Sequence, residues 1–198
     1  MPTTPKDLRE HLVKCTLALL NVSQPEALSV REVARQAGVS SGAPYHHFGD
    51  KTGLLAACAE VGWLDLLARL EAVDPTAALD VQLQNQARVY VTFALERPGP
   101  YRLMMSSVFD DQGRFSHLAA YRARAMRSML TLIALSGAAG TDAVRIKQRG
   151  VAVWSLLHGY AILKLDGAIA ARAADGTTSA VLQLAVRAAL LPEAPTAP

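Results

Sequence analysis

The sequence predicts an all-α protein in which a small N-terminal head of three helices is joined through a long fourth helix to a larger helical body. Apolar residues recur at helical spacing through most of the 198 residues. The breaks between these runs contain Gly, Pro, Ser, Thr or Asp, the residues that start and end helices. No segment shows the alternation that is typical of a strand. About nine helices are therefore expected, with the head at 1–50, the body at 51–191 and a disordered tail at 192–198.

The first helix is expected to run from Thr4 to about Leu20. Thr4 can serve as the N-cap, Pro5 suits the first helical position, and Asp7 places a negative charge in the first turn. The side chains that repeat on its inward face are Leu8, Leu12, Cys15 and Leu19. This face is expected to provide part of the core of the head.

The second helix is expected at about 30–37. Ser29 and Glu32 have the spacing of a capping box, in which each side chain bonds the backbone N–H of the other residue. Gly38 follows at the position where the end of a helix favours a left-handed residue. The apolar residues that recur on one face are Val30, Val33, Ala34 and Ala37.

The third helix is short and is expected at about 41–47. Ser40 can cap it, and Pro44 is compatible with it if the helix begins near Ala43, because an N–H in the first turn has no helical partner. Two short helices joined by a glycine turn have the spacing of a helix-turn-helix. This motif lays its second helix in the major groove of DNA.

The body is expected to contain six helices. Asp50 caps the first of them, Asp74 and Pro75 start the second, the Pro-Gly-Pro run at 98–100 ends it, and Thr141 caps the fifth. The expected ranges are about 51–72, 74–96, 101–108, 116–135, 141–165 and 179–191.

The N-terminal end of the third helix carries the predicted DNA-reading surface. Its short side chains can approach base edges, where hydroxyl groups, a methyl group and a glycine backbone can each make contacts. The predicted reading residues are Ser40, Ser41, Gly42, Ala43, Tyr45 and His46. Because none of them is an arginine, bidentate recognition of guanine from this helix is not expected.

Two helix N-termini beside this surface are predicted to hold phosphates. Lys51 lies in the first turn of the fourth helix, where free N–H groups and the helix dipole favour an anion, and Ser29 lies at the corresponding end of the second helix. The competing interpretation places Tyr45 and Phe48 in the core of the head and leaves both histidines solvated. We expect the core for Phe48 and contact with DNA for Tyr45, His47 and Lys51.

The run from Gly38 to Lys51 resembles the tetracycline-repressor (TetR) family of bacterial transcription regulators. The residues in register with the family's motif are Gly38, Val39, Ser40, Gly42, Tyr45, His47, Phe48 and Lys51. The resemblance implies nine helices, three in the head and six in the body, and it assigns His47 and Lys51 to the DNA backbone. Two departures are Pro44, where the family more often has a bulky apolar residue, and the connection at 21–25, which lacks a frequent glycine.

A homodimer is expected because the segment 150–163 is apolar nearly all round a helix, so that one face needs a partner. The segment 154–159 resembles a Trp-x-x-x-His-Gly signature of one branch of TetR C-terminal domains. Within it, His158 could line a ligand pocket or act in catalysis, but a core histidine bonded to a backbone carbonyl is the favoured interpretation. The predicted interface residues are Gly150, Trp154, Leu157, Ala161, Leu182, Ala185, Val186, Ala189 and Leu190.

The resemblance also implies a small-molecule effector in the body, whose binding shifts the fourth helix and spreads two heads out of register with a palindromic operator. Aromatic and Met side chains favour an apolar or aromatic effector. The predicted pocket residues are Trp63, Tyr90, Phe93, Tyr101, Met104, Met105, Tyr121, Trp154 and His158. A ligand-responsive repressor is the expected function, and the alternative is a DNA-binding protein that works through architecture without an effector.

Other classes of function are disfavoured. The sequence has no glycine-rich phosphate loop, HExxH motif or nucleophile elbow, and the Asp110-Asp111 pair is interpreted as a solvated turn, so an enzyme is not expected. Cys15 and Cys58 lie in apolar helical patterns without a partner at metal-ligand spacing, so neither a metal nor a cofactor is expected.

A cytoplasmic protein without a membrane partner is expected. Charged residues from Lys6 onward leave no room for a secretory signal. The longest uncharged stretches in apolar regions, 128–141 and 150–163, are too short to span a bilayer. The net charge of +3 permits binding to nucleic acid but does not establish it, so the DNA prediction depends on where the side chains lie.

Overall fold

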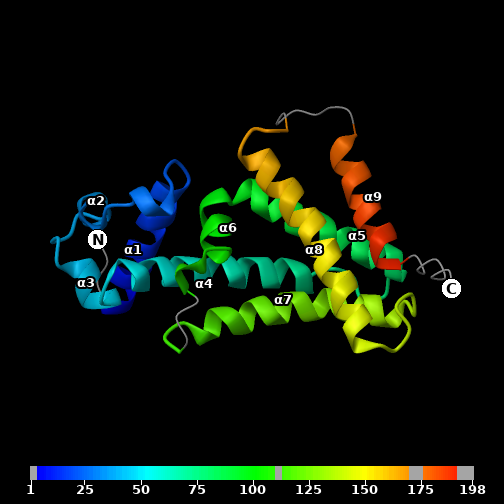
Figure 1. The fold of residues 1–198 in the computed structure, drawn as a ribbon. Helices are drawn as coiled ribbons and strands as arrows, with labels where there is room; N and C mark the ends of the chain where they lie inside the picture. The colour runs from blue at the N-terminus through cyan, green and yellow to red at the C-terminus, as the bar shows by residue number, and fades with distance from the viewer. Residues whose placement is uncertain (1–3, 110–112, 170–175, 191–198) are drawn as a thin grey trace. The chain divides into compact units, whose positions relative to one another are not determined.

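The computed structural model describes residues 4–109, 113–169 and 176–190. Within these ranges there are nine α-helices, two short 3-10 helices and no strand, which confirms the predicted all-α class (Figure 1). The α-helices are α1 (Pro5–Leu20), α2 (Val30–Gln36), α3 (Ala43–Phe48), α4 (Lys51–Glu71), α5 (Leu79–Glu96), α6 (Pro98–Met104), α7 (Ser116–Leu135), α8 (Ala143–Leu165) and α9 (Thr177–Leu190), and the 3-10 helices are η1 (Pro25–Ala27) and η2 (Ser107–Phe109). The predicted tail at 192–198 and the Asp110-Asp111 turn lie outside the described residues.

The chain divides into two compact units. The first comprises Met1–Asp65 and Arg97–Tyr121, and the second comprises Leu66–Glu96 and Arg122–Pro198. The first unit therefore contains α1 to α3, α6 and parts of α4 and α7, and the second contains α5, α8, α9 and the remaining turns of α4 and α7. All residues predicted to contact DNA fall within the first unit, in one body with α6 and the segment that leads into α7.

The core of the first unit is formed by side chains of α1, α2, α4 and α6. The predicted start of α1 is confirmed, because Thr4 and Asp7 form a capping box with hydrogen bonds of 3.1 and 3.2 Å. Leu12, Val33 and Tyr101 are fully buried, although they come from three different helices. Apolar burial of this extent is the main source of stability for a small helical unit.

The α6 helix lies very close to the end of α1. A Cβ atom at Gly99 would lie 2.7 Å from the carbonyl oxygen of Leu20, so only glycine fits this approach. The predicted helix at 101–108 is corrected to Pro98–Met104, followed by η2. Pro98 and Pro100 occupy its first turn, where a missing N–H has no helical partner to lose.

The predicted capping box of α2 does not form. Ser29 is the N-cap residue but makes no side-chain capping hydrogen bond. The Glu32 carboxylate instead accepts two hydrogen bonds of 2.8 and 2.5 Å from Arg35. The charged partner one turn further on outcompetes the backbone N–H of Ser29, because hydrogen bonds between charged groups are the stronger ones.

Two further N-caps are displaced from the predicted residue. The N-cap of α3 is Gly42 and not Ser40, whose carbonyl oxygen closes a turn with the N–H three residues later. The N-cap of α8 is Asp142 and not Thr141, and its side chain accepts a backbone hydrogen bond of 2.8 Å. Short polar residues at adjacent positions are similar caps, so sequence alone does not distinguish them.

The start of α5 is also later than predicted. Asp74 accepts hydrogen bonds from the N–H and the hydroxyl of Thr76, at 2.8 and 2.7 Å, and so closes a local turn. Gln82 donates to two carbonyl groups of this turn, including that of Pro75. Side-chain bonds of this kind compete with helix formation, and α5 therefore begins at Leu79.

The second unit is organised around α5, α8 and α9, which pack on one another (Figure 1). Tyr160 and Thr178 join α8 to α9 through a hydroxyl–hydroxyl hydrogen bond of 2.5 Å. The guanidinium group of Arg149 donates to carbonyl oxygens in the last turn of α9, where a positive charge is favoured. The buried core residues are Leu83, Ala87, Val91, Leu132, Ile133, Ala139, Val153, Leu157, Tyr160, Leu182, Ala185 and Ala189.

Candidate nucleic-acid interface

A tight glycine turn separates α2 from α3. Gly38 has a φ of +68°, in the left-handed region that side chains disfavour, which confirms the prediction for this residue. The N–H of Val39 donates to the carbonyl oxygen of Ala34 at 3.0 Å and closes the end of α2. The turn therefore fixes the direction in which α3 leaves α2.

The α3 helix has one buried and one exposed face. Pro44 and Phe48 are buried, and their spacing of four residues places them on the same side. Phe48 is only 9% exposed and lies under the Arg9 guanidinium, 5.2 Å from its ring centroid. The predicted core role of Phe48 is thus confirmed, and the opposite face is left for other contacts.

The predicted reading residues lie on or beside that outer face. Tyr45 is 47% exposed, so its ring is not part of the core. Ala43 and His47 are half-buried. The exposed residues of the predicted reading set are Ser40, Ser41, Gly42, Tyr45 and His46.

The N-terminus of α4 lies directly after α3. Asp50 caps α4 as predicted, because its Oδ1 accepts a hydrogen bond of 2.7 Å from the N–H of Gly53. Lys51 donates from its Nζ to the carbonyl oxygen of Glu26 at 2.9 Å, which ties α4 to η1. Ser29, the other predicted phosphate contact, is exposed at the start of α2.

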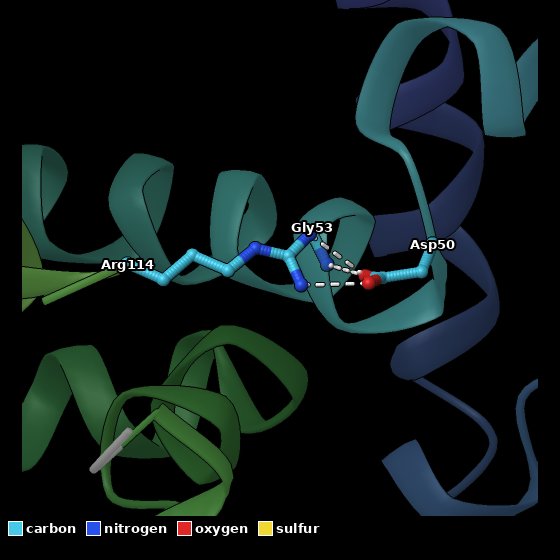
Figure 2. A network of polar contacts seen from close by, with 3 residues as sticks. All are labelled: Asp50, Gly53 and Arg114. Atoms are coloured by element: carbon cyan, nitrogen blue, oxygen red, sulfur yellow. Dashed lines mark hydrogen bonds and ion pairs between the residues drawn. The ribbon is translucent and has the colours of Figure 1, made fainter. Parts of the chain in front are cut away.

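Sequence reasoning missed a further residue at this position. Arg114 forms a two-pronged ion pair with Asp50, with Nη1–Oδ2 and Nη2–Oδ1 distances of 2.6 and 3.0 Å (Figure 2). The pKa of Asp50 is lowered, chiefly by the hydrogen bonds from the Arg114 guanidinium and next by the hydrogen bond from the Gly53 N–H. No local pattern could have revealed this pair, since 64 residues separate its members.

The nine predicted pocket residues divide between the two units. In the first unit, Trp63, Tyr101 and Met104 are buried, whereas Met105 and Tyr121 are half-buried. The Tyr121 hydroxyl donates to Glu60 at 3.2 Å. The remaining four, in the second unit, are Tyr90, Phe93, Trp154 and His158.

Three of those four residues form a polar aromatic cluster, which we call the Tyr90 cluster: Tyr90 of α5 with Trp154 and His158 of α8. The Trp154 Nε1 donates to the Tyr90 hydroxyl at 2.9 Å, and that hydroxyl lies 3.4 Å from His158 Nδ1. The centroids of the Trp154 and His158 rings are 5.7 Å apart. All three residues are half-buried, and burial lowers the pKa of His158. His158 thus has a side-chain hydroxyl among its partners.

The predicted dimer residues lie mainly in the core of a single chain. Gly150, Leu157, Ala161, Leu182, Ala185 and Ala189 are buried, and Val186 and Leu190 pack against the same core. The sequence could not reveal this because α8 is apolar on several faces, and α5 covers one of them. The large apolar side chains of α8 and α9 that remain exposed are Val144 (63%), Val151 (44%), Leu156 (37%), Leu163 (47%) and Leu184 (53%).

The cysteines lie in the core, as expected from their apolar surroundings. Cys15 and Cys58 are both buried, and desolvation raises the pKa of the Cys58 thiol to about 12. Among residues 4–109, 113–169 and 176–190, no group of three or more His, Cys, Asp or Glu side chains could hold a metal ion. None of the helices in the described part of the chain is both long and apolar enough to cross a membrane.

Comparison with known proteins identifies both parts of the chain. Residues 13–58 match the family of bacterial regulatory proteins called the tetR family. Residues 83–189, more than half of the chain, match the family of tetracyclin repressor-like C-terminal domains. The narrower branch suggested by Trp154 to Gly159 stays a prediction.

Individual relatives agree with the family matches. The HTH-type transcriptional regulator BetI of Yersinia pestis is 29% identical over 152 residues, which cover 67% of this chain and 75% of BetI. A tetR-family regulatory protein from Rhodococcus RHA1 has the same fold, with a TM-score of 0.73, 19% identity and coverage of 94% and 98% of the two chains.

A second solved structure shares the fold with a lower TM-score. It is a variant of TetR from Acinetobacter baumannii in complex with minocycline, with a TM-score of 0.63, 19% identity and coverage of 90% and 92%. The helix-turn-helix geometry and the matches along the chain lead to one assignment. The chain belongs to the TetR family and is a transcriptional regulator with a DNA-binding domain.

Proposed function

We propose that this regulator is a ligand-responsive repressor that binds a palindromic operator as a homodimer and leaves it when a small apolar or aromatic effector binds. The observation that carries the proposal is the outer face of α3, where Tyr45 is 47% exposed while Phe48, three residues later, is buried. A short helix that is anchored on one side and bears small polar groups on the other suits the major groove.

The chemistry of this face favours particular base contacts. Ser40 and Ser41 can donate to or accept from base edges, Ala43 offers a methyl group for thymine, and Gly42 permits a close backbone approach. Tyr45 and His46 extend the reading surface with aromatic groups that can also form hydrogen bonds. Since the proposed reading set contains no arginine, its sequence preference should not rest on the two-pronged contact to guanine.

Contacts to the DNA backbone are assigned to Ser29, His47 and Lys51. Lys51 donates to the Glu26 carbonyl at 2.9 Å, but an ammonium group has three donors, so two remain for phosphate oxygens. Its place in the first turn of α4 adds the helix dipole to its own charge. These contacts set affinity and register, whereas α3 sets sequence preference.

The dimer is proposed to form through exposed apolar residues of α8 and α9. Val151 and Leu184 are 44% and 53% exposed, and large apolar side chains at such exposure are typical of surfaces that bind a partner. A two-fold dimer presents two α3 helices and therefore requires half-sites about 34–36 Å apart or a multiple of that spacing. The buried residues predicted earlier then stabilise each subunit rather than the interface.

For the effector, we propose the Tyr90 cluster as a recognition element. Its rings can stack on an aromatic ligand, while its hydroxyl and imidazole groups can bond a polar substituent. Binding must favour one conformation of the dimer over the other to release DNA. The minocycline complex of a protein with the same fold supports a small-molecule ligand for this fold.

Selection of bound sites from a random DNA pool tests the proposal. The expected result is an inverted repeat whose half-sites have the spacing given above. Enrichment of no sequence would contradict operator binding, and a site without symmetry would contradict the dimer. A ligand screen on the selected site then separates a responsive repressor from an architectural DNA-binding protein, because only the former loses operator affinity.

The proposal also assigns the protein to the cytoplasm, where its operator would lie, and gives it no enzymatic role. Fractionation of cells that express the full chain tests the location. Recovery in a membrane fraction would contradict it.

A further inference from the structure

We propose that Arg114, which lies outside the helix-turn-helix, is a positioning residue that holds the α3–α4 turn ready for DNA. Its contact with Asp50 does not depend on the proposed function, whereas its effect on operator binding rests on the proposed function. The residue lies in the segment before α7, within the same compact unit as α3 and the start of α4.

The Asp50 carboxylate accepts three hydrogen bonds from two residues. Asp50 Oδ1 accepts both the Gly53 N–H at 2.7 Å and the Arg114 Nη2 at 3.0 Å, and Oδ2 accepts Nη1 at 2.6 Å (Figure 2). The N-cap of α4 is thus also the anchor for a distant arginine. A two-pronged pair fixes orientation as well as distance, unlike a single contact from lysine.

The Arg114 side chain is also restrained by a contact with an aromatic ring. Its guanidinium carbon lies 4.8 Å from the ring centroid of Phe115, which is only 7% exposed. Phe115 in turn meets Phe109 edge to face, with ring centroids 5.7 Å apart. Restricting the side chain in this way reduces the entropy lost when the ion pair forms.

The absence of a side chain at Gly53 leaves room for the guanidinium group, and Gly49 allows the turn beside it. A Cβ at Gly53 would lie 3.1 Å from Arg114 Nη2 and 2.1 Å from the carbonyl oxygen of Phe48. Gly49 has a φ of +79°, which other residues rarely adopt. The chain between Phe48 and Gly53 therefore turns sharply against Arg114, directly after the reading helix.

The charge of Asp50 gives the contact a consequence for DNA. Asp50 immediately precedes Lys51, the residue proposed to bind phosphate, and an uncompensated carboxylate there would repel the DNA backbone. Arg114 neutralises it without requiring a phosphate contact of its own. Lys51 is tied to Glu26 at 2.9 Å, so the start of α4 is held from two sides.

Five variants of the full chain test this role. Arg114→Gln removes the charge and the fork, Arg114→Lys retains the charge alone, and Asp50→Asn retains a capping side chain without the ion pair. The double variant combines Arg114→Gln with Asp50→Asn. The matched control is Arg124→Gln, which breaks a comparably exposed pair with Glu71 in the second unit.

The first measurement is amide hydrogen exchange without DNA. Arg114→Gln should accelerate exchange at residues 49–54 and leave the fully buried part of α1 around Leu12 unchanged, and the control should accelerate neither. Unchanged exchange at 49–54 in Arg114→Gln would overturn the positioning role, whether or not the protein binds DNA.

The second measurement is affinity for the selected operator over a range of salt concentrations. Arg114→Gln should weaken operator binding about threefold per head, as is typical when an exposed ion pair is lost. For a dimer with two heads, the loss of affinity is about tenfold. Arg114→Lys should fall between wild type and Arg114→Gln. In the Asp50→Asn background, Arg114→Gln should weaken binding less than about threefold, because its partner is already absent.

A direct phosphate contact gives a different pattern. The two single effects would then add in the double variant, and the salt slope would fall by about 0.9 for each lost contact, which would overturn a role through Asp50. If the wild-type chain binds no DNA, the proposed function fails instead, and hydrogen exchange still decides whether Arg114 positions the turn.

Discussion

Single side chains in the DNA-binding region differ in role because they differ in exposure. Tyr45 and Phe48 are both aromatic and three residues apart, yet 47% of the first is exposed and only 9% of the second. Phe48 therefore stabilises the head, and Tyr45 remains available to bases. Lys51 lies beside them, where its charge acts on any DNA sequence.

We predict that Lys51→Ala weakens binding to all sequences about equally and lowers the salt slope by about 0.9 per head. Ser41→Ala or Tyr45→Ala should instead change which sequences are preferred, with little change in slope. Gel-shift titrations at several salt concentrations measure both quantities, and Arg124→Ala is the control for loss of one positive charge elsewhere. A change of preference in Lys51→Ala with an unchanged slope would contradict this assignment.

A pH-dependent stability is expected from His158. Burial lowers its pKa, so the unfolded chain takes up a proton near the ordinary value of 6.5 and the folded chain only at lower pH. The stabilisation from the neutral imidazole is complete above that value and is lost as pH falls from it to the lower pKa of the folded state. Replacing His158 with Gln should therefore flatten the decline in unfolding free energy between about pH 7 and pH 5.

Urea unfolding of wild type and His158→Gln at several pH values, at one protein concentration, provides the measurement. His11→Gln is the matched control, since its imidazole lies on α1 of the first unit. If wild type and His158→Gln declined in parallel, the imidazole would not be the titrating group.

Two close approaches within the first unit depend on glycine. Gly99 lets α6 approach the end of α1, and Gly53 lets the α3–α4 turn close. Gly159 of α8 is different, because no atom lies within 4 Å of the Cβ that it lacks. The same residue type is therefore required at one position and merely tolerated at another.

We predict opposite effects of alanine at Gly99 and Gly159. Gly99→Ala should lower the unfolding free energy by roughly 1–3 kcal/mol, because its Cβ would meet backbone atoms of Leu20. Gly159→Ala should raise it by up to about 1 kcal/mol, because alanine favours the helix and fits the space. Urea midpoints followed by circular dichroism measure both, and equal effects would contradict the close approach of α6 to α1.

For the whole molecule, the decisive property is assembly. Joint replacement of Val151 and Leu184 with Glu should place four charges in the proposed interface and give a monomer, as measured by light scattering during size-exclusion chromatography. Val22→Glu, at a site that is 86% exposed in the first unit, should leave the dimer intact. A dimer that persists in the double variant would place the interface elsewhere.

Loss of the dimer also has a consequence for DNA. A monomer keeps one intact head but loses the second binding event, which two linked heads make effectively intramolecular. Operator affinity should therefore fall steeply while binding to an isolated half-site changes little. Thus, assembly and recognition can be tested separately.

Local chemistry determined much of this protein from the sequence. The cap at Thr4, the left-handed turn at Gly38 and the cap at Asp50 each depend on residues within four positions, so the helix-turn-helix could be predicted without a structure. The same spacing arguments placed Phe48 in the core. The spacing arguments failed where two local partners competed. The Glu32 carboxylate accepts hydrogen bonds from Arg35 and not from the backbone N–H of Ser29.

Contacts between distant segments required the folded chain. The pairing of Arg114 with Asp50 and the contacts of Tyr90 with Trp154 and His158 join residues that are at least 64 positions apart, and no periodicity encodes them. Likewise, α8 is apolar on several faces, and only the packing of α5 and α9 shows which face is core and which is left exposed. Helix formation depends on near neighbours, but the burial of each face depends on which other helix covers it.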